Sequence, residues 1–233
     1  MKYNERETLA ENNRASITGT VMHDPEFDHA HYGKVFFKTV VEVTRTSGTK
    51  DYLPVIIPEE MLSDGYVKEG SMIRLTGRIQ THNMHTDSVH KLQVYFFARQ
   101  IEPAEDDLLT AGNNVIMLRG TICTDPLRRR TPLGRYITDL IFAVNRTYGR
   151  SDYIPCIIWG TTTPMELLKK SNSMIICGRM QSRTYEKNHP DGSKTTETVY
   201  EISAATVKTE EEKEEPEWIS SEEQKTLLPS VAS

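Results

Sequence analysis

Arginines and aromatic side chains concentrate in the second half of this 233-residue chain, and the two residue types together could form a binding surface. Arginine neutralises phosphates and stacks on bases, and tyrosine and tryptophan offer flat faces on which bases stack. Sequence-neutral binding of a single nucleic-acid strand requires both. The candidate cations are Arg119, Arg128, Arg129, Arg130, Arg135, Arg146, Arg150, Arg179 and Arg183. The candidate aromatics are Tyr136, Tyr148, Tyr153, Trp159, Tyr185 and Tyr200.

The alternative interpretation is that the arginines cover a solvated face while the aromatics pack inside the fold. The distribution of charge favours binding. The whole chain has a formal charge of −5, but residues 112–208 hold 14 Lys and Arg against 8 Asp and Glu. Residues 12–103 hold 10 against 11, and most of the remaining acids lie in residues 104–111 and 209–233. A basic segment therefore stands beside acidic ones, which is the pattern expected of a nucleic-acid-binding domain.

An internal repeat with a constant offset of 101 residues organises the chain. Its matches include Asn12-Asn13 with Asn113-Asn114, Gly19-Thr20 with Gly120-Thr121, Asp51-Tyr52 with Asp152-Tyr153, and Gly77-Arg78 with Gly178-Arg179. The repeat predicts two domains, residues 12–103 and 112–208, joined by an acidic linker at 104–111. Residues 209–233 are acidic and poor in apolar residues, so they are predicted to form a disordered tail.

Each repeat is rich in β-branched and aromatic runs separated by turn residues, which predicts an all-β fold. In the second repeat the expected strands are residues 115–123, 135–147, 153–159, 173–185 and 196–207. Five strands with one helix between the third and fourth is the order of an OB fold, a partly open barrel that commonly binds oligonucleotides. The sequence therefore predicts two tandem five-stranded OB-fold barrels.

One short helix is expected in each repeat. In the second, Thr163 is the candidate N-cap and Pro164 the first helical residue, and the helix is expected to end at Lys169-Lys170. Its expected buried side is Met165, Leu167 and Leu168. In the first repeat the equivalent segment is 58–62.

The segment NNVIMLRGTICTDPLRRRTPLGRYITDLIFAVNRTYGRSDYIPCIIWG, residues 113–160, resembles bacterial single-stranded DNA-binding proteins. The shared features are Gly, Asp-Pro, an Arg-rich stretch, Thr-Pro-x-Gly, Ala-Val-Asn-Arg and a terminal Trp-Gly. GRMQSRTYEKNHPDGSKTTETVYEI, residues 178–202, continues the resemblance with the family's Gly-Arg-x-Gln-x-Arg-x-Tyr hairpin. The similarity is close over residues 113–207 and weak over 12–102.

The resemblance implies that the chain coats single-stranded DNA without chemistry, during replication, recombination and repair. Tyr148, Tyr153, Trp159 and Tyr185 fall where that family places its base-stacking aromatics. Family members usually assemble four OB folds, so a chain with two implies a homodimer. The expected DNA contacts are these four aromatics, Tyr52 in the first repeat, and Arg128, Arg129, Arg130, Arg135, Arg146, Arg150, Arg179 and Arg183.

The first repeat departs from that pattern. Tyr52 keeps the position of Tyr153, but Ser47, Pro58 and Met84 stand where the second repeat has its other three aromatics. Two interpretations remain open: this repeat binds DNA weakly, or it serves chiefly in assembly.

Other functions are less well supported by the sequence. His29-x-His31 and His82-x-x-His85 could suggest a metal site, but no carboxylate or thiolate completes a recognisable ligand set, and no cofactor is expected. Phosphate-loop, His-Glu-x-x-His and Gly-x-Ser-x-Gly motifs are missing, so no enzyme is indicated. Nothing in the sequence predicts a membrane span, and a cytoplasmic, nucleoid-associated protein is expected.

Partner recruitment is a separate question, because the family's acidic tail ends in Pro-Phe and this chain ends in Pro-Ser-Val-Ala-Ser. The tail could act through Glu217-Trp218-Ile219, which would contact replication or repair proteins, or it could simply solubilise the chain. Two alternatives to a coating protein remain. One is a primosome-type or mobile-element accessory protein, and the other is an enzyme subunit whose repeats recognise substrate.

Overall fold

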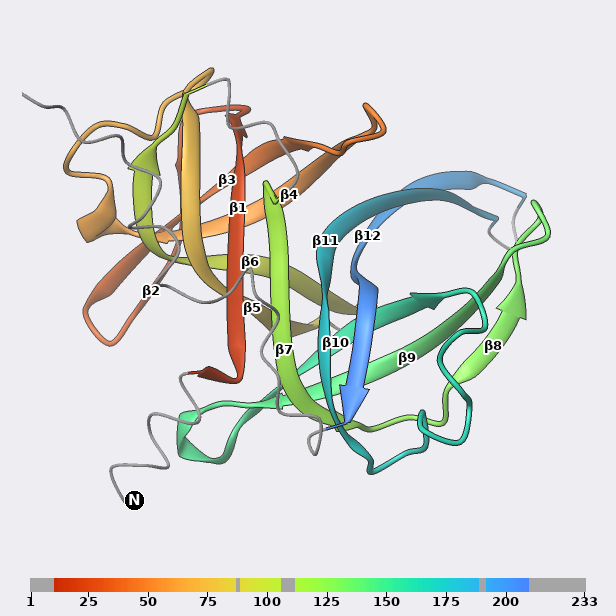
Figure 1. Cartoon of the computed structure of the whole chain (residues 1–233). Coiled ribbons are helices and arrows are strands. Elements are labelled where there is room, and N and C mark those ends of the chain that lie inside the picture. The colour runs from red at the N-terminus through yellow and green to blue at the C-terminus, as the bar shows by residue number, and fades with distance from the viewer. Residues whose placement is uncertain (1–10, 87–88, 106–111, 189–191, 210–233) are drawn as a thin grey trace, which may run out of the picture.

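The computed structural model describes residues 11–86, 89–105, 112–188 and 192–209, and nearly all of the regular structure is β-strand (Figure 1). The first repeat contains β1 Asn13–Val21, β2 Glu26–His31, β3 Lys34–Thr44, β4 Lys50–Pro58, the 3₁₀ turn η1 Glu59–Met61, β5 Met72–Thr86 and β6 Val89–Pro103. The second contains β7 Asn114–Ile122, β8 Leu127–Arg130, β9 Tyr136–Asn145, η3 Thr147–Gly149, β10 Ser151–Trp159, β11 Ser173–Asn188 and β12 Lys194–Thr209. Most of the expected linker and tail lies outside the described residues.

Each repeat closes into a barrel of five strands. The first runs β1-β3-β4-β6-β5 and returns to β1, and the second runs β7-β9-β10-β12-β11 and returns to β7. Within each barrel the third and fourth strands of the ring, β4–β6 or β10–β12, form a parallel pair, and the other pairs are antiparallel. This is the strand order of the OB fold, so the predicted fold class is confirmed.

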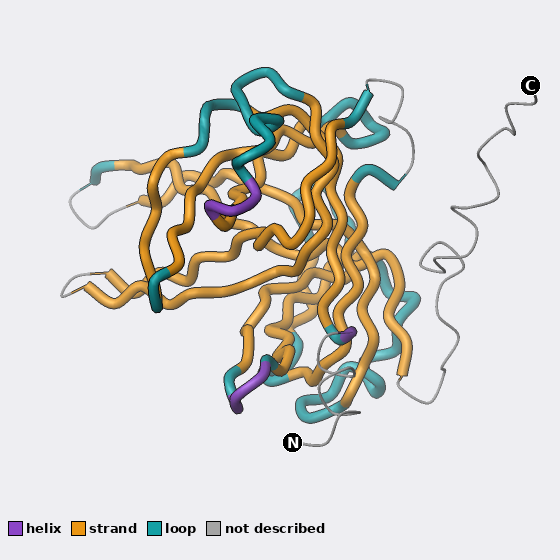
Figure 2. Tube along the Cα trace, turned by 90° about the vertical axis from the view of Figure 1, so that its left-hand side faces the viewer, coloured by secondary structure: helices purple, strands orange, loops and turns teal. Residues whose placement is uncertain are grey.

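Two short strands lie outside the rings and were not expected. The segments after the Asp24-Pro25 and Asp125-Pro126 turns fold back as β2 and β8 and pair with β3 and β9. A hairpin of this kind satisfies backbone groups that would otherwise stay open on the outer edge of the neighbouring strand. Figure 2 shows both barrels from the side, with the short helical turns placed between the strands.

The expected helix of the second repeat is replaced by two overlapping turns. The N–H of Leu167 donates to the carbonyl of Pro164 at 3.2 Å, and Leu168 donates to Met165 at 3.1 Å. These bonds span three residues instead of four, and Ser171 then leaves the right-handed region with a φ of 75°. A helix this short forms too few bonds to offset the cost of nucleation. Leu168 is buried as predicted, but Leu167 is exposed.

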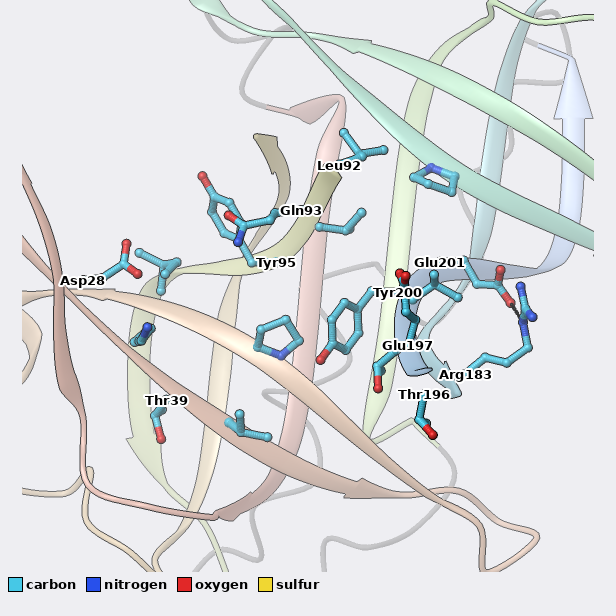
Figure 3. Close-up of a pocket in the computed structure, with 18 of the residues that line it drawn as sticks. Asp28, Thr39, Leu92, Gln93, Tyr95, Arg183, Thr196, Glu197, Tyr200 and Glu201 are labelled. Atoms are coloured by element: carbon cyan, nitrogen blue, oxygen red, sulfur yellow. Dashed lines mark ion pairs between the residues drawn. The ribbon is translucent and has the colours of Figure 1, made fainter. Parts of the chain in front are cut away.

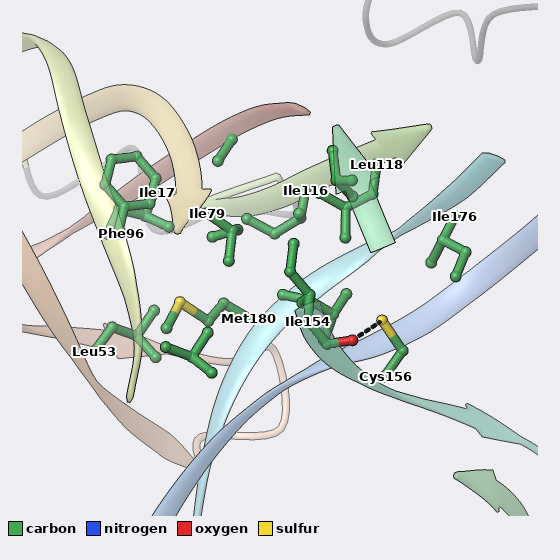
Figure 4. Close-up of a cluster of buried hydrophobic side chains, with 14 of the residues drawn as sticks. Ile17, Leu53, Ile79, Phe96, Ile116, Leu118, Ile154, Cys156, Ile176 and Met180 are labelled. Atoms are coloured by element: carbon green, nitrogen blue, oxygen red, sulfur yellow. Dashed lines mark hydrogen bonds between the residues drawn. The ribbon is translucent and has the colours of Figure 1, made fainter. Parts of the chain in front are cut away.

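Strands β1 and β7 join the two barrels as an antiparallel pair, in red and green at the centre of Figure 1. Ala15 lies opposite Ile116, its own equivalent at the 101-residue offset. The pairing therefore has approximate two-fold symmetry about this point. A single apolar cluster continues through both barrels, from Ile17 and Phe96 to Leu118 and others (Figure 4).

The repeated glycines mark places where strands approach closely. A Cβ on Gly120 of β7 would lie 2.2 Å from the carbonyl oxygen of Ala143 on β9, and Gly19 has the same relation to Glu42.

Replacing Gly120 with alanine should therefore lower the free energy of unfolding by about 1–3 kcal/mol, because β7 and β9 must separate. Urea unfolding would measure this. Thr121→Ala on the same strand is the control and should cost less, and an equal cost would contradict the explanation.

Candidate nucleic-acid interface

Tyr153 and Trp159 lie on the outer face of β10. Ile154, Cys156 and Ile158 point into the barrel, so the alternation of a strand turns Tyr153 and Trp159 outward. Tyr153 is 48% exposed and Trp159 42%. Both rings therefore present surface to solvent, where they could stack on bases.

The orientation of Trp159 is set by its neighbours. It lies opposite Ile137 of β9, and its indole Nε1 donates to the Oγ of Ser203 on β12 at 3.2 Å. A tryptophan held by its one polar group presents a face of fixed orientation.

Tyr185 lies on a different element, the long hairpin formed by β11 and β12. It lines a cavity of about 910 Å³ between this hairpin and the first repeat (Figure 3). Pro54 and Val40 of the first repeat form part of the same lining, and Pro155 of β10 reaches it too. We call this cavity the inter-repeat groove. Tyr185 therefore faces a surface shared by both repeats.

Charges in the inter-repeat groove are largely balanced. Arg183 pairs with Glu201 at 3.5 Å, shown by the dashed line in Figure 3, and Lys187 pairs with Glu197 at 3.3 Å. The guanidinium of Arg183 also lies 5.8 Å from the centre of the Tyr185 ring. A phosphate entering here would compete with carboxylates for these cations.

Arg146 is held inside the protein. Its Nε donates to Oδ2 of Asp152 at 2.5 Å, a second nitrogen also bonds that carboxylate, and the same nitrogen donates to the carbonyl of Thr81 at 3.1 Å. Asp152 accepts the N–H of Thr81 at 2.6 Å. The hydrogen bond to Asp152 raises the pKa of Arg146. This network connects the repeats, so a structural role accounts for the arginine.

The first repeat contains the equivalent network, with Arg45 bonded to both carboxylate oxygens of Asp51 at 2.6 Å. Asp51 accepts the N–H of Ser182 at 2.8 Å. The two repeats therefore connect to each other by matched contacts on both sides of the β1–β7 pair.

Two other predicted arginines also bind within the fold. Arg128 donates to the Oγ1 of Thr138 at 3.1 Å and to the carbonyl of Thr163 at 2.9 Å. Arg179 donates to Gln181 at 3.3 Å, and burial together with nearby Arg45 lowers its pKa.

Arg129, Arg130, Arg135 and Arg150 are exposed, whereas Arg119 on β7 is half-buried. Arg129 pairs with Asp139 at 2.5 Å, and Arg130 donates to the carbonyl of Gly134 at 3.0 Å and lies 5.8 Å from the Tyr136 ring centre. Among the described side chains, Arg135 and Arg150 have no hydrogen bond or ion pair, which leaves them free to bind phosphate.

The last two predicted site residues are Tyr148 and Tyr52. Tyr148 belongs to η3, but its side chain lies outside the described residues. Tyr52 is exposed on β4, and its N–H donates to the Oγ of Ser182 at 3.1 Å, just as the N–H of Tyr153 donates to Thr81 at 3.0 Å.

Several aromatic residues of the first repeat were not predicted. Phe36 and Phe97 lie close together on its outer face, and His29 stacks on Phe36. The run Tyr95-Phe96-Phe97 indicates outward aromatic residues in the sequence, because strand alternation sends its first and third residues to the outer face.

Among the described residues, no three His, Cys, Asp or Glu side chains are grouped so that they could hold a metal ion. No helix in the described part of the chain is long and apolar enough to cross a membrane.

Comparison with known proteins assigns the family. The sequence model of the Single-strand binding protein family matches residues 113–219. Single-stranded DNA-binding protein B of Bacillus subtilis is 32% identical over 81 residues, which cover 31% of this chain and 72% of that protein. The chain belongs to the single-strand binding protein family.

Other similarities agree with membership of the single-strand binding protein family. Single-stranded DNA-binding protein 2 of Listeria monocytogenes is 35% identical over 98 residues, which cover 38% of this chain and 60% of that relative's length. A crystal structure of the wild-type single-stranded DNA binding protein from Thermus aquaticus has a TM-score of 0.65 at 20% identity. The match covers 84% of this chain and 92% of that one, which extends the fold similarity over both repeats.

Proposed function

We propose that this chain binds single-stranded DNA without sequence preference and without catalysis, coating the strand during replication, recombination and repair. The observation that carries the proposal is the outward pair Tyr153 and Trp159 on one strand. Aromatic faces of this kind stack on any base, since every base has a π-face. The family and the names of the relatives support the ligand.

Phosphate contacts come from the second repeat in this proposal. Residues 112–208 have the excess of cations, and Arg135 and Arg150 are exposed and unpaired among the described side chains. We further propose that the chain works as a cytoplasmic homodimer with four barrels, and that residues 209–233 contact replication or repair proteins. The homodimer proposal rests on the two barrels of each chain and on the resemblance to a family whose members usually assemble four.

Fluorescence titration with oligo-dT at several salt concentrations tests the function. The logarithm of the binding constant should fall linearly with the logarithm of the salt concentration, with a slope of about −0.7 for each phosphate neutralised. Binding releases cations from the strand, and this release becomes less favourable as salt rises. The fluorescence of Trp159 should be quenched as its ring stacks on a base.

An incubation of the chain with nucleoside triphosphates and single-stranded DNA is the control, and it should show no turnover. Absence of binding at low salt would remove the proposal, and a flat salt plot would remove the role of the arginines.

A further inference from the structure

A row of rings that ends in a guanidinium crosses the outer face of the first repeat. The ring of His29 on β2 stacks on Phe36 of β3, with centroids 4.7 Å apart and planes 15° from parallel. Phe36 lies 5.9 Å from Phe97 of β6, and the guanidinium of Arg78 on β5 lies 5.0 Å from the Phe97 ring centre. We call these four residues the aromatic ladder.

The aromatic ladder occupies the place that Trp159 has in the second repeat. Pro58 stands at the equivalent position on β4, and it lies opposite Phe36 just as Trp159 lies opposite Ile137. Phe97 is equivalent to Ser203, the residue that holds the indole, because each lies opposite the arginine that follows the bulge glycine. The first repeat therefore has aromatic rings at the same place, supplied by the two neighbouring strands.

We propose that the aromatic ladder is a second base-stacking site, which takes nucleobases of the same single-stranded DNA. This inference rests on the proposed function and extends it to the repeat whose sequence lacks the family aromatics. Phe36 and Phe97 are half-buried and His29 is exposed, so the ladder presents ring surface to solvent. Neighbouring aromatic rings with a guanidinium at one end can supply the stacking and cation–π contacts that bases make.

The aromatic ladder is also connected to the rest of the interface. Phe97 lies opposite Ile56, and Ile56, Lys38 and Tyr95 line the inter-repeat groove together with Tyr185. A strand leaving the ladder along this face would enter the inter-repeat groove without crossing a barrel. This continuity favours a polymer as the occupant over a compact partner.

Two charged pairs lie beside the aromatic ladder, whereas Arg78 within it has no carboxylate partner among the described side chains. Asp28 bonds His29 at 2.6 Å, and Lys34 pairs with Glu60 at 3.7 Å. Phe36 and Phe97 carry no charge, so their contribution to binding should be stacking and should involve no release of counterions. Replacing these two rings should alter affinity without altering the salt dependence.

The test compares the wild-type chain with Phe36→Leu/Phe97→Leu, which keeps apolar bulk and removes both rings. Affinity for a long oligo-dT should fall at least about fivefold, the lower limit for one lost stack, at an unchanged salt slope. Tyr32→Asn is the matched control, because Tyr32 is 93% exposed at the hairpin tip and lies outside the ladder. It should leave affinity unchanged.

Each outcome is decisive. If the wild-type chain fails to bind oligo-dT, the proposed function itself is wrong. If it binds and the double variant binds equally well, only the ladder proposal is overturned. If light scattering without DNA shows that the double variant differs in mass from the wild-type chain, the ladder proposal is overturned in favour of a contact between copies of the chain. If the double variant unfolds, the single Phe97→Leu variant provides the reading, with the melting temperature as the check on folding.

Discussion

Replacing Asp152 with alanine should lower the free energy of unfolding by about 3–5 kcal/mol, the largest stability effect expected of a single substitution here. Asp152 is 1% exposed and Arg146 is 24% exposed, so the change leaves a cation inside the protein without its anion. It also removes the acceptor of the Thr81 N–H, which lies on the other repeat. Loss of this network weakens both the second barrel and its contact with the first repeat.

Urea unfolding followed by circular dichroism measures this cost. The matched control is Asp139→Ala, which breaks the Arg129 pair on the surface and should cost at most about 1 kcal/mol. Equal costs for the two variants would show that solvent reaches the Asp152 network, and would contradict the structural role given to Arg146.

Removing both outward rings of β10 should have the largest effect on binding. Two lost stacks at roughly 1–3 kcal/mol each predict that Tyr153→Ala/Trp159→Ala binds oligo-dT about 30-fold or more weakly. Both side chains are exposed, so folding should be little changed. Fluorescence anisotropy with a labelled oligonucleotide measures the affinity, because the double variant lacks Trp159, whose quenching reports binding in the wild-type chain.

Two further variants sharpen this prediction. Tyr66→Ala removes an exposed ring that lies outside the interface and should leave affinity unchanged. Tyr52→Ala should cost less than Trp159→Ala, because residues 12–103 lack the excess of cations that residues 112–208 carry. If Tyr52→Ala weakened binding as much as Trp159→Ala in folded protein, the rings of β10 would not be the principal platform.

The sequence by itself determined the repeat and the strands that close each barrel, without β2 and β8. These follow from local periodicity, since a strand sends alternate residues to opposite faces wherever it lies. The sequence placed a helix at Pro164 that the structure replaces with turns, because a segment so short between strands gains too little from helical bonds.

Only the tertiary structure decided which predicted residues are free to act. Arg146 and Arg128 look like Arg135 and Arg150 in sequence, yet the first two have partners brought by other strands. Tyr185 faces the first repeat because its hairpin crosses the junction. The aromatic ladder draws residues from four strands, from His29 to Phe97. Partners of this kind depend on the register between strands far apart in the chain, which no local pattern contains.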